Sequence, residues 1–183
     1  MRRTRLVITA VPALILLGLQ SGCPVNPIVI PVPLQLGDAL GLFQVEAGVP
    51  SELAGTTSFD TGGINIAAVN LEIDPSVVTF TPADAQAKSR LAQAGGTTIV
   101  VTAWLAPAAD VNTVCGGGTQ FGPFTVTLDA NNNVTSISPS NIDLAPAIDL
   151  LNQGEVALCL RVESPISGTV RIETLTLNLS PGL

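Results

Sequence analysis

The chain has 183 residues, and its 14 acidic residues against seven basic ones give a net charge of −7, which disfavours binding to the phosphate backbone of nucleic acids. It contains no histidine and no tyrosine, which excludes a Ser-His-Asp triad and a histidine metal ligand and leaves few aromatic platforms for sugar rings or bases. Its apolar residues are chiefly Val, Ile, Leu and Ala, a composition that favours a packed β protein over a disordered chain.

The N-terminus has the features of an export signal. A basic segment, MRRTR, precedes an apolar run at 6–19, which is shorter than the roughly 20 residues that a permanent membrane helix needs. The residues Ser21, Gly22 and Cys23 that follow resemble the end of a bacterial lipoprotein signal, with Gln20 at the place where that pattern has Leu. The resemblance implies that residues 1–22 are removed and that the Cys23 thiol carries a diacylglyceryl group. An ordinary signal peptide that is cut nearby is the alternative.

The segment after Cys23 is expected to connect the lipid to a folded domain. Removal of residues 1–22 leaves four basic residues against 14 acidic ones, a net charge of −10. Residues 24–36, PVNPIVIPVPLQL, contain four prolines, which favour an extended and semi-rigid spacer. We expect this spacer to become strand-like towards its end; an edge strand, where proline is tolerated, is the alternative. The predicted organisation is a signal peptide (1–22), a lipidated cysteine with its tether (23–37) and a single domain (38–183).

Apolar residues recur with a period of two from about residue 38 onward. Such alternation is typical of strands with one buried face, and it predicts an all-β, antiparallel β-sandwich, immunoglobulin-like or jelly-roll-like, with one or two inserted helices. The run 98–105, TIVVTAWL, is apolar on both faces and predicts a central strand with Trp104 buried. In the last predicted strand, 169–179, the phase slips between Ile172 and Leu175, which indicates a β-bulge or a change of sheet.

Two short segments have helical signals. In 81–95, TPADAQAKSRLAQAG, we expect Thr81 to cap the helix, Pro82 to occupy its first position and Asp84 to complete a capping box, with Gly95 ending it. An apolar stripe would face the core, formed by Ala83, Ala87, Leu91 and Ala94. A second helical turn is expected at 146–153, ended by Gly154.

Turn residues separate the later strands. The segments 129–133 and 164–168 are both predicted to connect antiparallel hairpins. Asp129, Asn131 and Asn133 match the first half of an EF-hand loop, but Val134 and Ser140 stand where calcium binding requires Gly and Glu. The sequence therefore predicts an ordinary turn here and no metal site.

Two further cysteines remain if Cys23 carries the lipid. An even pair in an exported chain predicts a disulfide between Cys115 and Cys159, whose loop corresponds to about 4 kcal/mol of chain-entropy stabilisation. Two free thiols are the alternative. The bridge would fix the glycine-rich loop 115–119 to a strand on which Cys159 points away from the core.

These features predict a non-enzymatic lipoprotein, exported to a bacterial cell envelope and anchored to its membrane through Cys23. No catalytic residue, cofactor or metal is predicted; the partners are the membrane and an envelope protein or glycan. One alternative is a carbohydrate-binding or cohesin-like adhesion module, because 71–77, LEIDPSV, is similar to a short turn of cohesin-type modules. A second alternative is an acid-pair hydrolase, whose carboxylates would come from separate loops, such as those of Asp60, Asp74, Asp110 and Asp143.

Overall fold

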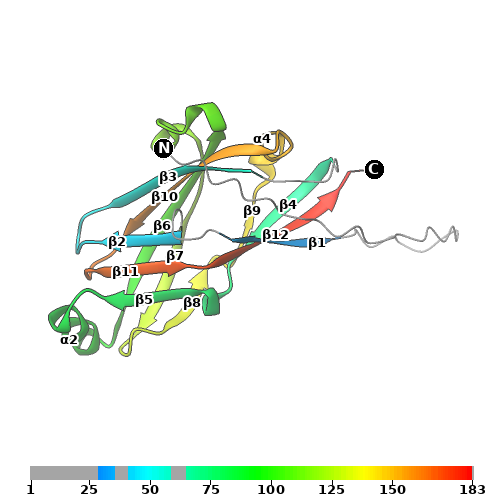
Figure 1. The fold of residues 1–183 in the computed structure, drawn as a ribbon. Helices are drawn as coiled ribbons and strands as arrows, with labels where there is room; N and C mark the ends of the chain where they lie inside the picture. Colours follow the sequence, from blue (N-terminus) through cyan, green and yellow to red (C-terminus); the bar gives the residue numbers. More distant parts are fainter. Residues whose placement is uncertain (1–28, 36–40, 59–64, 183) are drawn as a thin grey trace, which may run out of the picture.

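The computed structural model describes residues 29–35, 41–58 and 65–182, and in these ranges twelve strands form three sheets (Figure 1). Every pairing between two named strands is antiparallel. One hydrophobic core contains residues from all three sheets. The predicted all-β sandwich is therefore confirmed.

The five-stranded sheet forms one layer, in the order β3-β10-β6-β7-β8. Its strands are β3 (Ser51–Ser58), β10 (Glu155–Glu163), β6 (Gly96–Pro107), β7 (Thr119–Asp129) and β8 (Val134–Ser138). The segment 98–105 lies within the middle strand, β6, as its apolar sequence predicts. Phe124, Val126 and Leu128 of β7 are all buried, which confirms their predicted alternation.

The other two sheets form the second layer. The three-stranded sheet contains β2 (Leu42–Val45), β11 (Gly168–Ile172) and β5 (Val78–Pro82), and the four-stranded sheet contains β1 (Ile30–Gln35), β12 (Thr174–Pro181), β4 (Ile66–Glu72) and β9 (Asn141–Asp143). The three-stranded sheet crosses in front of the five-stranded sheet in Figure 1. The chain passes from β11 to β12 at Glu173, so the phase slip in the sequence marks a change of sheet.

The end of the proline-rich segment belongs to the sandwich. Strand β1 pairs with β12 from Ile30↔Leu179 to Gln35↔Thr174, and it is an outermost strand of its sheet. Proline is tolerated there because an edge strand does not need all of its N–H groups for the ladder. The strand-like end that the sequence predicts is thus present, and the sheet includes the last part of the predicted tether.

Of the two predicted hairpins, only one is a hairpin. The turn 129–133 joins the paired strands β7 and β8. The turn 164–168 instead crosses between the layers, because β10 pairs with β3 and β6 whereas β11 pairs with β2 and β5. Turn residues indicate a chain reversal but do not specify the partner of the next strand. At its end a Cβ on Gly168 would lie 2.5 Å from the Phe80 ring, so the crossing requires glycine at this position.

Helix α2 (Ala85–Ala94) begins later than the sequence predicts. Its N-cap is Asp84, whose carboxylate accepts a hydrogen bond from the N–H of Ala87 at 2.7 Å. Thr81 is not the cap, because it pairs with Thr169 and extends strand β5.

The rest of the helical prediction is confirmed in part. Gly95 ends α2 in a left-handed conformation with φ 73°. Within the predicted stripe, Ala87 and Leu91 are buried, whereas Ala83 and Ala94 are exposed. The second predicted helical segment contains α4 (Ile148–Leu151), which follows a 3-10 turn at Ala145–Ala147.

The position of this cap can be tested by two alanine substitutions. Asp84→Ala is expected to lower the free energy of unfolding by about 1 kcal/mol, because the Ala87 N–H loses its partner. Thr81→Ala, at an exposed strand position, is the control and should cost clearly less. Urea titration of both variants measures the difference. A larger loss of unfolding free energy for Thr81→Ala would show that Thr81 caps the helix, as the sequence alone predicts.

Candidate functional site

The outer face of the five-stranded sheet carries a second, small hydrophobic cluster. On β10, Val156, Leu158, Leu160 and Val162 face the main core, whereas Cys159 lies on the opposite face, as predicted. Cys159 is nevertheless fully buried, with 0% exposure. A loop between β6 and β7 covers this face of the sheet, and it includes a 3-10 turn, Ala108–Asp110, and the short α3 (Val114–Gly117).

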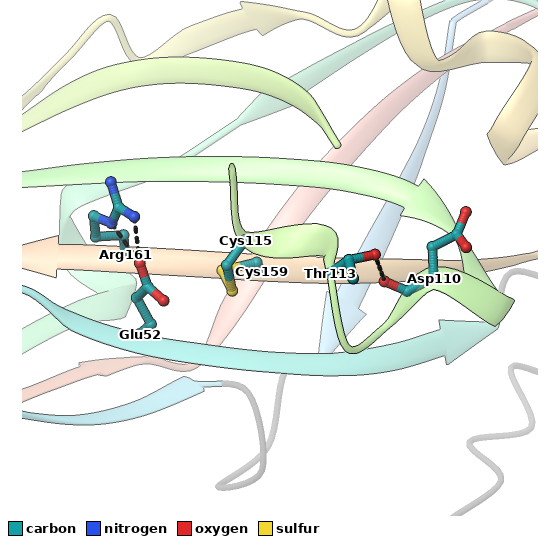
Figure 2. Close-up of a disulfide and its surroundings, with 6 residues drawn as sticks. All are labelled: Glu52, Asp110, Thr113, Cys115, Cys159 and Arg161. Atoms are coloured by element: carbon teal, nitrogen blue, oxygen red, sulfur yellow. Dashed lines mark hydrogen bonds and ion pairs between the residues drawn. A yellow bond between two sulfur atoms is a disulfide. The ribbon is translucent and has the colours of Figure 1, made fainter. Parts of the chain in front are cut away.

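A disulfide holds this loop against the sheet. Cys115 of α3 is bonded to Cys159 of β10, with a Cα–Cα distance of 5.3 Å and a sequence separation of 44 residues (Figure 2). The predicted pairing is confirmed, and the alternative of two free thiols is excluded. Because the bridge joins a loop to a buried strand, its removal would release the loop rather than the core.

Trp104 lies under the loop. It is directly opposite Cys159 in the β6–β10 ladder and is only 4% exposed, so the predicted burial is confirmed. The buried cluster around it lies apart from the main core and contains Trp104, Ala106, Val114, Ala157 and Cys159. The main core covers one face of the central strand β6, and the loop covers the other. This explains why the strand is apolar on both faces.

One charged pair borders the cluster. The guanidinium of Arg161 lies 4.9 Å from the centroid of the Trp104 ring and is ion-paired with the Glu52 carboxylate across the β3–β10 ladder (Figure 2). The two side chains are 35% and 40% exposed, so the pair contributes only about 0–1 kcal/mol. This group could not be predicted from the sequence, because the register that places Arg161 opposite Glu52 joins residues 109 positions apart.

The glycines at the end of the loop have a structural explanation. Gly116 has φ 86°, which favours glycine, and a Cβ on Gly118 would lie 2.6 Å from the carbonyl oxygen of Leu105. The triple glycine thus allows the loop to turn and to approach β6 closely.

A pocket of about 310 Å³ opens beside the loop. Pro107 and Leu150 line it together with the polar residues Asp110, Thr113 and Thr119. Thr113 donates hydrogen bonds from its N–H and its hydroxyl to the carbonyl oxygen of Asp110, which holds this turn together. Asp110 is the only carboxylate among the described lining residues, so this pocket lacks the pair of acids that a glycoside-hydrolase mechanism needs.

A second depression of about 290 Å³ lies on the same sheet near its other end. Pro50, Val100 and Pro165 supply apolar surface, and Glu163 is the only carboxylate in the described lining. Neither depression therefore brings together two acids in the part of the chain that the structure describes.

The aspartates that the sequence offered as a hydrolase pair lie in separate turns. Asp74 accepts a hydrogen bond from the N–H of Ser76 at 2.8 Å, and Asp143 accepts one from the N–H of Ala145 at 2.8 Å. The backbone N–H and the side chain of Ser76 lower the pKa of Asp74 below its ordinary value. Asp110 lines the first pocket, and Asp60 lies outside the described residues.

The Asp129 carboxylate holds the β7–β8 turn together through hydrogen bonds within the turn. It accepts hydrogen bonds from the side-chain amide of Asn133 at 2.9 Å, from the N–H of Asn133 at 2.9 Å and from the N–H of Asn131 at 2.8 Å. The bonds from Asn133 are the main reason that the pKa of Asp129 is lowered. Asn132 adopts φ 64°, a conformation that Asn tolerates. Hydrogen bonds within the turn thus account for the Asp-x-Asn-x-Asn sequence.

Among the described residues, no group of three or more His, Cys, Asp or Glu side chains is arranged to hold a metal ion. In the same residues, no helix is long and apolar enough to cross a membrane. Cys23, the predicted lipid attachment site, lies outside the described ranges. No family model matches the sequence, and no curated protein matches it.

The disulfide is open to a direct test with Cys115→Ser. This variant should lose about 4 kcal/mol of unfolding free energy by the loop-entropy relation for a separation of 44 residues. Its Trp104 emission should shift to longer wavelength, because Trp104 is the only tryptophan and lies under the released loop. Cys23→Ser, which leaves the bridge intact, is the control. An unshifted emission spectrum in Cys115→Ser would show that the loop stays in place without the bridge.

The Asp129 turn makes stability depend on pH. The pKa of Asp129 is lowered in the folded state. The ionised carboxylate therefore stabilises the fold fully above the unfolded-state pKa of about 3.9, and this stabilisation is lost as the pH falls through the pKa of the folded state. Asn133→Ala should raise the pKa of Asp129 towards the ordinary value and weaken this acid-side dependence. Asn131→Ala should leave it unchanged, because only the backbone of Asn131 bonds to Asp129. NMR titration of the Asp129 carboxyl carbon distinguishes the variants, and equal shifts would contradict the assignment.

Proposed function

We propose that this protein is a non-enzymatic lipoprotein of a bacterial cell envelope, exported and anchored to a membrane through a lipid on Cys23, whose acidic β-sandwich has a structural or binding role. The observation that carries the proposal is the combination of a lipoprotein-like N-terminus with a β-sandwich that begins soon after it, at Ile30. A lipid-modified cysteine followed shortly by a folded domain is the arrangement that places a domain at a membrane surface.

The connection between the lipid and the sandwich is short. Residues 23 and 30 are seven positions apart, and a fully extended chain of that length spans at most about 25 Å. The first residue of β1 would therefore stay within that distance of the bilayer. The net charge of −10 after removal of residues 1–22 would discourage the sandwich from lying flat on anionic lipid.

A non-enzymatic role agrees with what the carboxylates do. Asp74, Asp129 and Asp143 each bind backbone N–H groups of their own turns, so their acceptor capacity serves the fold. Catalytic carboxylate pairs instead face each other across a cleft. The absence of histidine from the sequence removes the commonest general base.

Aromatic burial bears against a carbohydrate-binding role. Trp104 and four of the five phenylalanines are buried, namely Phe43, Phe80, Phe121 and Phe124. Phe59 lies outside the described residues. A sugar-binding platform needs an exposed aromatic face, so we favour a structural or protein-binding role for the sandwich.

The intact mass of the mature protein tests the anchoring. We expect a chain that starts at Cys23, carries a diacylglyceryl group and is two hydrogens lighter than its reduced form, recovered in the membrane fraction. Cys23→Ser is the control and should remain unmodified. Gln20→Leu, which completes the lipoprotein pattern, should increase the processed fraction. A soluble wild-type chain without lipid and with another N-terminus would refute the anchoring.

A further inference from the structure

Sheet edges are places where a β protein can pair with another chain, because their outer N–H and C=O groups have no strand beside them. Among the described strands, six lie at the edges of the three sheets: β1, β2, β3, β5, β8 and β9. Proteins that stay monomeric protect such edges with prolines, lysines, bulges or very short strands.

Five of the six edge strands have at least one of these protective features. Strand β1 contains Pro31 and Pro33, and β5 has five residues and ends at Pro82. Strands β2 and β9 have four and three residues. Strand β8 has five residues, and its register with β7 shifts between Thr127 and Leu128.

Strand β3 lacks all of these features. It has eight residues, SELAGTTS, with no proline and no lysine, and its ladder with β10 runs from Ser51↔Val162 to Ser58↔Glu155 without a register shift. Its one charged side chain, Glu52, is already ion-paired with Arg161. No backbone group of β3 has a described hydrogen-bond partner outside that ladder. No residue of β3 is buried, which leaves the strand accessible at the border of the five-stranded sheet (Figure 1).

We propose that β3 pairs antiparallel with β3 of a second copy of this chain, about a two-fold axis perpendicular to the sheet near Ala54 and Gly55. The two five-stranded sheets would then form one continuous sheet of ten strands. Such an axis keeps the outer faces of both sheets on the same side, so each outward residue meets another outward residue.

A second copy fits this edge because β3 is complementary to itself. With the axis at Ala54, Glu52 faces Thr56 of the partner copy; with the axis at Gly55, it faces Ser58. Like charges directly opposite each other destabilise a strand pair, and neither arrangement contains such a pair. The residues at the centre, Ala54 and Gly55, are small and allow close approach. Leu53, which packs partly exposed against the core, would gain further cover.

Net charge opposes this pairing. Each copy carries a net charge of −7 or, without residues 1–22, −10, so the two copies repel each other. Added salt screens repulsion between exposed charges. The dimer should therefore become tighter as ionic strength rises, whereas an association that depends on opposite charges would become weaker.

Sedimentation velocity of the full chain in a density-matched detergent tests the proposal. The wild type should form a dimer whose dissociation constant falls as sodium chloride increases from 0.05 to 0.5 M. Ala54→Lys puts two lysines close together at the axis and should raise that constant by about tenfold or more. The matched control is Ser136→Lys, which adds the same charge at an exposed position of β8 on the other edge of the sheet, and should still dimerise. Matching far-UV circular dichroism spectra of the two variants show that both fold.

Amide hydrogen exchange identifies the surface. The outward N–H groups of residues 51–58 should exchange slowly in the wild type and fast in Ala54→Lys. A wild type that stays monomeric, or a dimer that Ala54→Lys leaves intact, would overturn the proposal.

Discussion

The sandwich is built around strand β10, which is buried on both of its faces. From Val156 to Leu160 every residue is at most 7% exposed, and the ladders with β3 and β6 occupy both of its edges. One face contributes to the main core between the layers. The other face would be an apolar surface exposed to solvent if the loop before β7 did not cover it. The disulfide to Cys159 secures that cover at the centre of the strand.

This arrangement determines which surfaces of the sandwich remain available to partners. The loop occupies the outer face over β10 and β6, and the Arg161–Glu52 pair borders it. The aromatic residues that the structure describes are buried in one or the other hydrophobic cluster. In the part of the chain that the structure describes, the remaining surface is mostly polar and includes the two depressions and the edges of the sheets. A binding role would therefore use main-chain groups and small polar side chains more than aromatic or charged clusters.

The acidic character of the chain serves the fold as well as solubility. Aspartates accept backbone hydrogen bonds at the start of α2, in the β7–β8 turn and after β4 and β9. Each such bond satisfies a donor that an irregular segment would leave unpaired. Since the same carboxylates are negatively charged at neutral pH, the turns also keep the surface acidic, which disfavours nonspecific association with nucleic acids and anionic lipids.

Properties that depend on near neighbours in the chain could be predicted from the sequence alone. Periodicity of two indicated the strands and their buried faces, the slip after Ile172 indicated a β-bulge or a change of sheet, and Gly95 indicated the end of α2, because side-chain direction and left-handed backbone are local. With Cys23 set aside as the predicted lipid site, the two remaining cysteines predicted the Cys115–Cys159 bridge. Three other features could not be read from local sequence: Thr81 belongs to a strand, the 164–168 turn crosses between sheets, and Trp104 lies under a loop with Arg161 over its ring. These outcomes depend on which distant strands pair and in what register, and the free energy of that choice is shared over the whole ladder rather than carried by the residues at the turn.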